Sequence, residues 1–68
     1  MIDIGIKLKA LRLERDLKQS EIAEKVNIKQ NTLSQFENNK GRPSYEVLVK
    51  FCKLYGVTAD YLLGLVEY

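Results

Sequence analysis

Near the middle of the chain, a short segment carries uncharged side chains that can hydrogen-bond in a defined direction. These residues are Gln30, Asn31, Ser34 and Gln35. Their spacing puts them on one side of a helix, whereas an ordinary solvated helix face is richer in Lys and Glu. A Gln or Asn amide both donates and accepts, which matches the N6 and N7 edge of adenine in the major groove of duplex DNA. The segment therefore favours base contact, with a plain solvated polar face as the alternative.

Groups that usually carry catalysis or hold metals are scarce in this chain. It has no histidine and one cysteine, Cys52, which we interpret as a small buried hydrophobe because no partner Cys or His exists. The sequence contains no metal-ligand cluster, no nucleophile and base at a catalytic spacing, and no glycine-rich phosphate loop. We therefore expect no enzyme, and no bound metal, cofactor or small-molecule ligand.

The composition is that of a small globular domain. The chain has 68 residues, of which 46% are hydrophobic and 29% are charged. No apolar run approaches the roughly 20 residues needed to cross a bilayer, and the N-terminus lacks a signal-peptide pattern. We expect one domain over residues 1–68, with its core at about 4–64 and a short tail at 65–68. We also expect it to lie in the cytoplasm and away from membranes.

The distribution of charge is more informative than the net charge of +2. Between Lys25 and Arg42 the only acidic residue is Glu37, whereas that segment also contains Lys29 and Lys40. A cationic segment of this kind is suited to a phosphate backbone, although chance clustering would also produce it.

Apolar periodicity predicts three helices in the first part of the chain, at about residues 4–15, 19–26 and 29–38. Asn27 lies where the chain must turn between the second and third of these helices. Because Asn tolerates the left-handed backbone conformation better than any residue except Gly, Asn27 can close the second helix. Ile28 then anchors the turn in the core.

Two further helices are predicted in the remainder of the chain. Ser44 is suited to cap a fourth helix that ends at Gly56, and Thr58 to cap a short fifth helix that ends at Gly64. No segment has the alternation of a strand, so the expected fold class is all-α, with five short helices.

The predicted third helix has an apolar and a polar side. Leu33 and Phe36 lie close together on its inward side, because successive residues are about 100° apart around a helix. Asn31 and Gln35 then point almost directly away from the core, where a second molecule could contact them.

The chain carries the pattern Leu17-x-Gln19-x-x-Ile22-Ala23-x-x-Val26-x-Ile28-x-x-x-Thr32-Leu33-Ser34-x-Phe36-Glu37, followed by Pro43-Ser44 and Leu62-Leu63-Gly64. With this pattern it resembles the lambdoid phage repressor and Cro-type (XRE-like) helix-turn-helix family. The resemblance covers about residues 4–64. It implies a compact five-helix, lambda-repressor-like DNA-binding domain, with the helix-turn-helix at the second and third helices and the third helix in the major groove.

The resemblance also implies roles for individual residues. It makes Gln30, Asn31, Ser34 and Gln35 the base-reading set, and it places Gln19 where its side chain meets a phosphate and braces Gln30. Candidate phosphate contacts are Gln19, Lys29, Thr32, Asn38, Lys40 and Arg42. Ordinary solubility is the alternative for Gln19 and, taken singly, for Asn38, Lys40 and Arg42. Lys18 and Lys29 depart from the family pattern, because small hydroxyl caps are common where they stand.

A buried ion pair between Arg12 and Glu37 is implied by the resemblance and agrees with helix geometry. Glu37 lies about 40° from Leu33 around the predicted third helix, so it faces inward enough to require a cation. We assign this pair to structure and not to catalysis.

The function that fits best is a sequence-specific transcription regulator, most simply a repressor that binds a near-palindromic double-stranded DNA operator as a homodimer. The expected dimer contacts are Ala59, Leu62, Leu65, Val66 and Tyr68. Those apolar residues could equally be the last part of the core or the stub of a longer protein. The alternative function is a protein-interaction module, such as an antitoxin-like or anti-repressor protein, on the same fold.

Overall fold

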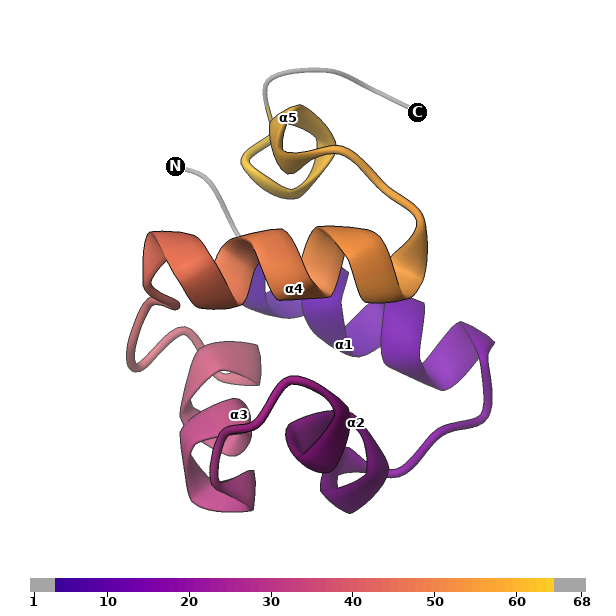
Figure 1. Ribbon diagram of the computed structural model, residues 1–68, viewed down its shortest axis with the longest axis vertical. Coiled ribbons are helices and arrows are strands. Elements are labelled where there is room, and N and C mark those ends of the chain that lie inside the picture. Colours follow the sequence, from indigo (N-terminus) through magenta and orange to yellow (C-terminus); the bar gives the residue numbers. More distant parts are fainter. Residues whose placement is uncertain (1–3, 65–68) are drawn as a thin grey trace.

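The protein forms five α-helices in the computed structural model, which describes residues 4–64. The helices are α1 (Ile4–Glu14), α2 (Gln19–Lys25), α3 (Gln30–Glu37), α4 (Tyr45–Tyr55) and α5 (Ala59–Leu62). No strand occurs within residues 4–64, and the predicted all-α class is confirmed. In Figure 1, α4 runs across α1, with α5 on one side and with α2 and α3 on the other. α1 packs against both α3 and α5, and α2 packs against α3.

Every helix contributes a fully buried side chain to one hydrophobic core. These side chains are Leu8, Ile22, Leu33, Phe51 and Leu62, each with no exposed surface. Each such burial stabilises the fold by roughly 1.5–3 kcal/mol. The core therefore depends on all of the helices together, as expected for a chain this short.

The aromatic rings at the centre of the core have defined arrangements. Phe36 meets Phe51 edge to face, with ring centroids 6.5 Å apart. Phe51 stacks on Tyr55 at 6.2 Å. Since Phe36 is on α3 and Phe51 is on α4, the edge-to-face contact joins these two helices, whereas the stack of Phe51 on Tyr55 lies within α4.

The turn between α2 and α3 is closed in the way that the sequence predicts. Asn27 adopts the left-handed conformation with φ of 58°, and Ile28 is half-buried against the core. The Ile28 amide donates to the Ala23 carbonyl at 2.9 Å, while Lys50 on α4 reaches the Val26 carbonyl at 3.5 Å. The small Ala23 side chain is 3% exposed, so α3 can approach α2 closely.

The start of α1 lies directly against the end of α3. Asn39, which has φ of 58°, accepts a hydrogen bond from the Gly5 amide at 3.0 Å. A Cβ atom on Gly5 would lie 2.6 Å from Asn39 Oδ1 and 2.9 Å from the Glu37 carbonyl, and it would clash with the Phe36 carbonyl. Only a residue without a Cβ allows this approach.

The caps predicted for the last two helices are confirmed. Ser44 Oγ accepts from the Val47 amide at 3.3 Å, and Thr58 Oγ1 accepts from the Tyr61 amide at 3.1 Å. Gly56 ends α4 in the left-handed conformation.

Two expectations about apolar residues need correction. Leu62 was expected at a dimer interface, but it is fully buried in the core of a single copy and cannot contact a partner. Cys52 is half-buried against the core instead of fully buried. Of the other expected dimer contacts, Ala59 is half-buried, whereas Leu65, Val66 and Tyr68 lie outside the described residues.

Candidate nucleic-acid interface

The outward side of α3 consists of uncharged side chains that are free to meet another molecule. Gln30, Asn31 and Gln35 are all exposed, whereas Leu33 is fully buried and Phe36 is 8% exposed. The helix holds this orientation because its apolar residues are fixed in the core. Three of the four residues predicted to read bases therefore project from one exposed helix surface.

The fourth predicted base reader, Ser34, is less accessible than the others. It is half-buried, and Asn38 Nδ2 donates to its carbonyl at 2.9 Å and to its Oγ at 3.4 Å. Thr32 is also half-buried, at the edge of the same surface. The donor group of Asn38 is thus engaged within the protein, so a phosphate contact there requires it to share or exchange these bonds.

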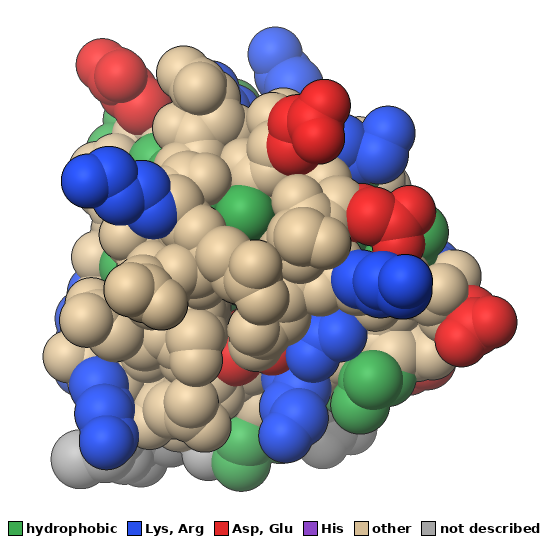
Figure 2. All heavy atoms as spheres, turned by 90° about the horizontal axis from the view of Figure 1, so that it is seen from below, with side chains coloured by type: hydrophobic (Ala, Val, Ile, Leu, Met, Phe, Trp, Pro, Cys, Tyr) green, Lys and Arg blue, Asp and Glu red, His purple; other side chains and the backbone are tan. Residues whose placement is uncertain are grey.

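The stretch of chain that includes α3 exposes cations but no carboxylate. Lys25, Lys29, Lys40 and Arg42 are exposed, whereas Glu37, the single acidic residue of the stretch, is 4% exposed. Figure 2 shows the side of the molecule on which α2 and α3 lie: its middle is mostly uncharged, and both cationic and acidic side chains stand around it. The exposed charges of residues 25–42 are all positive, whereas α2 also exposes Glu21 and Glu24.

The ion pair predicted between Arg12 and Glu37 is present and buried. Arg12 Nε donates to Glu37 Oε2 at 2.8 Å, and Arg12 Nη2 donates to Oε1 at 2.9 Å. The hydrogen bond to Glu37 raises the pKa of Arg12 above its ordinary value, against the opposing effect of burial. Because α1 and α3 each supply one partner, the pair fixes the C-terminal end of α3 against α1.

Gln19, the first residue of α2, makes a contact that differs from the predicted one. The sequence suggested that its side chain braces Gln30, but its Nε2 atom donates instead to Glu37 Oε1 at 3.0 Å. The preceding Lys18 provides no side-chain cap, because an ammonium group has no acceptor. The Glu21 carboxylate accepts from the Lys18 amide at 2.9 Å and so stabilises this end of α2.

The α2–turn–α3 unit is shared with a known family of proteins. A family model described as Helix-turn-helix matches residues 8–62. The chain belongs to this helix-turn-helix family.

The relatives that the chain matches include transcriptional regulators. It is 41% identical over 63 residues to the HTH-type transcriptional regulator ImmR of Bacillus subtilis (strain 168), covering 93% of this chain and 50% of ImmR. It is 39% identical over 51 residues to the cryptic phage CTXphi transcriptional repressor RstR of Vibrio cholerae, covering 75% of this chain and 46% of RstR. The chain thus spans about half the length of these relatives. Their family supports the prediction that the chain is not an enzyme.

A solved structure with the same fold is that of the P22 c2 repressor in complex with a synthetic operator. The two structures superpose with a TM-score of 0.85 and 27% sequence identity, over 88% of this chain and 91% of the repressor chain. The predicted lambda-repressor-like fold is confirmed by this similarity.

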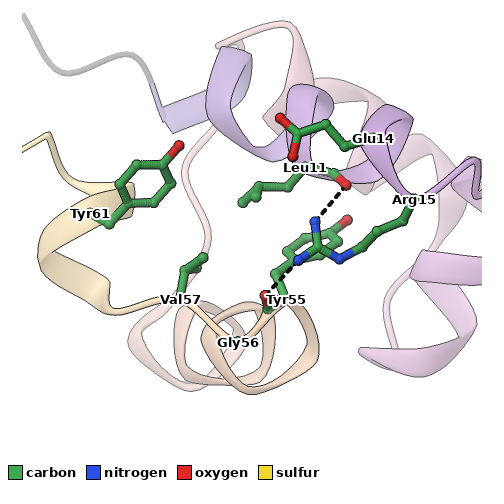
Figure 3. Close-up of a pocket in the computed structure, with 7 residues that line it drawn as sticks. All are labelled: Leu11, Glu14, Arg15, Tyr55, Gly56, Val57 and Tyr61. Atoms are coloured by element: carbon green, nitrogen blue, oxygen red, sulfur yellow. Dashed lines mark hydrogen bonds between the residues drawn. The ribbon is translucent and has the colours of Figure 1, made fainter. Parts of the chain in front are cut away.

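Two cations of the helix-turn-helix domain serve the fold in a way that the sequence did not reveal. Lys7 Nζ donates to the Tyr61 carbonyl at 2.7 Å and lies 4.8 Å from the centre of its ring. Arg15 donates to the Leu11 and Tyr55 carbonyls at 3.0 and 2.8 Å, and its guanidinium lies over the Tyr55 ring (Figure 3). Both cations join α1 to the C-terminal helices. Their partners are up to 54 residues away in the chain, so no local pattern indicates them.

A cleft of about 210 Å³ lies between the end of α1 and the connection from α4 to α5 (Figure 3). Its lining consists of Leu11, Glu14, Arg15, Tyr55, Gly56, Val57 and Tyr61. None of these residues belongs to the predicted base or phosphate contacts, so the cleft is separate from the α3 surface.

Neither a metal site nor a membrane segment is found in the part of the chain that the structure describes. Within residues 4–64, no group of three or more His, Cys, Asp and Glu side chains is placed to hold a metal ion. None of the helices there has the length and apolar character needed to cross a bilayer.

Proposed function

We propose that the chain is the DNA-binding unit of a transcriptional regulator and that α3 lies in the major groove of duplex DNA. The observation that carries this proposal is the row of exposed amides on α3, at Gln30, Asn31 and Gln35. Planar amides suit the donor and acceptor pattern of base edges, and cations flank them. Ser34 completes the set at a half-buried position, where it meets the DNA at close range.

Contacts to the phosphate backbone position this helix and supply much of the affinity. The proposed contacts are Gln19, Lys29, Thr32, Asn38, Lys40 and Arg42. Lys29, Lys40 and Arg42 are exposed and lie at or beyond the two ends of α3, as expected for contacts on either side of a groove. Among the six residues, Asn38 is the least suited, because its amide already donates to Ser34.

We propose further that two copies bind a near-palindromic operator as a dimer and that binding represses transcription in the cytoplasm. Half-sites about one helical turn apart would place both copies of α3 on one face of the DNA. Of the apolar residues expected at the dimer interface, Ala59 on α5 is the described residue that remains available. The repressors among the related proteins support repression.

In-vitro selection of binding sites from random duplex DNA, using the full chain, tests this function. The expected product is a consensus with twofold symmetry and half-sites about 10 base pairs apart. Selection of a single half-site would support DNA binding by the chain but would contradict the proposed dimer. Failure to enrich any sequence, with retention as weak as on random DNA, would favour a protein-interaction module on the same fold.

A further inference from the structure

One buried carboxylate joins the first three helices at a single point. Glu37, the last residue of α3, accepts two hydrogen bonds from Arg12 on α1 and one from Gln19, the first residue of α2. The Glu37 side chain is 1% exposed, so water does not compete for its oxygens. A buried acceptor with three donors constrains the orientation of each donating group.

The carboxylate decides which end of the Gln19 amide faces the protein. A carboxylate only accepts, so the amide nitrogen of Gln19 must face Glu37, at 3.0 Å. That nitrogen carries a second N–H besides the one that donates to Glu37, and the Gln19 side chain is only half-buried. An N–H group attracts a phosphate, whereas the amide oxygen would repel it.

Arg12 reinforces this orientation from a second direction. Its Nη1 atom donates to the Leu17 carbonyl at 3.0 Å, two residues before Gln19. The same guanidinium therefore fixes both the backbone leading into α2 and the carboxylate that holds the Gln19 side chain.

We propose that Glu37 is a positioning residue for DNA binding, which turns the free N–H of Gln19 toward a phosphate. Its contribution is separate from the stability that the ion pair gives to the fold. The inference rests on the proposed function, because the acceptor for this N–H is a phosphate of the DNA backbone. It adds a route by which a buried residue, out of reach of DNA, changes affinity without changing base preference.

A double-mutant cycle separates positioning from stability. Glu37→Gln alone leaves Arg12 without its buried anion, so it risks unfolding, whereas the paired change Arg12→Met with Glu37→Met replaces both charges with apolar groups and preserves the fold in comparable cases. Binding is measured for wild type, Gln19→Ala, the Met pair and the triple variant. The probes are the selected site and a mixed-sequence duplex of about 30 base pairs, long enough for two half-sites.

If Glu37 positions Gln19, the Met pair binds both duplexes about tenfold more weakly, as does Gln19→Ala, and adding Gln19→Ala to the Met pair costs less than a further twofold. A folded Met pair that binds like wild type would overturn the inference, as would losses that multiply in the triple variant. Absence of binding by the wild type would instead remove the proposed function itself.

A measurement on the free protein keeps the inference testable if the Met pair does not fold. By NMR, the Gln19 Nε2 proton that faces Glu37 should exchange with water at least tenfold more slowly than the side-chain amide protons of the exposed Gln30 and Gln35. Equal exchange at all three residues would show that Glu37 does not hold Gln19. In that case the positioning role is lost while DNA binding can still be observed.

Discussion

At the scale of single residues, the anchoring of α3 in the core determines which of its side chains another molecule can reach, as helical spacing predicts. The amides of Gln30, Asn31 and Gln35 are exposed because Leu33 and Phe36 are fixed in the core on the opposite side of α3. The partner of Gln19 could not be predicted in the same way. Its bond to Glu37 depends on how α2 sits on α3, which helical periodicity does not specify.

Removing one base-reading amide should reduce specificity more than general affinity. For Gln35→Ala we expect a loss of about 1–3 kcal/mol on the selected site, with relaxed preference at one base position, because one bidentate contact disappears. Titration of the selected site and of a mixed-sequence duplex measures both quantities. Equal losses on the two duplexes would remove Gln35 from the base-reading set.

Tyr55 makes the free energy of unfolding depend on pH in the alkaline range. Burial, assisted by the nearby Glu37 charge, raises the pKa of Tyr55 from its ordinary value near 10 to about 12. Between these values the unfolded chain releases the phenol proton while the native protein keeps it, so stability is present below pH 10 and falls as pH rises toward 12. The shift corresponds to at most about 2.7 kcal/mol.

Tyr55→Phe should remove that pH dependence. Urea unfolding at several pH values between about 9 and 12 should show wild type losing stability relative to the variant, and parallel curves would contradict the assignment. At neutral pH the variant should be as stable as wild type or more so, because the buried Tyr55 hydroxyl has no hydrogen-bond partner among the described residues.

At the scale of helices, capping and turn residues were predictable because their chemistry is local. Ser44 and Thr58 cap the next helix within three residues, and Asn27 closes its own turn. The junction of α1 with α3 was not predictable, because Gly5 and Asn39 are 34 residues apart. The contacts of Lys7 and Arg15 with the C-terminal helices were not predictable either, because those partners are also distant in the chain.

Gly5 should be intolerant of even a methyl group. Replacing a helical glycine by alanine ordinarily stabilises a helix by up to about 1 kcal/mol. At Gly5 this gain is outweighed, since the new Cβ would overlap backbone atoms of α3 and the Asn39 side chain. We expect Gly5→Ala to lose about 1–3 kcal/mol in urea unfolding.

Gly41→Ala is the matched control for this substitution. A Cβ at Gly41 would meet only Phe36 ring atoms at 3.8 Å, which is ordinary contact. Its stability should stay within about 0.5 kcal/mol of wild type. Similar effects at both glycines would mean that α1 and α3 do not require the close approach.

At the scale of the whole molecule, the arrangement of charge matters more than its total. A net charge of +2 would steer few anions, but within residues 25–42 the exposed charges are all cations, and the one carboxylate of that stretch is buried. The sequence indicated this asymmetry, and the structure shows that Glu37 is paired with Arg12 inside the protein, as predicted. The burial of Leu62 is also a property of the whole molecule, because this side chain of α5 is buried only by the complete core.

Lys40 tests whether this asymmetry binds DNA. An exposed lysine that contacts a phosphate releases a counterion, so Lys40→Ala should weaken binding to the selected site and to mixed-sequence DNA alike. It should also reduce the slope of log K against log salt by about 1. Lys53→Ala, an exposed lysine on α4 outside the proposed contacts, should leave both quantities unchanged. If the two variants had the same slope as wild type, Lys40 would be a solubilising residue and the phosphate contacts would have to lie elsewhere around α3.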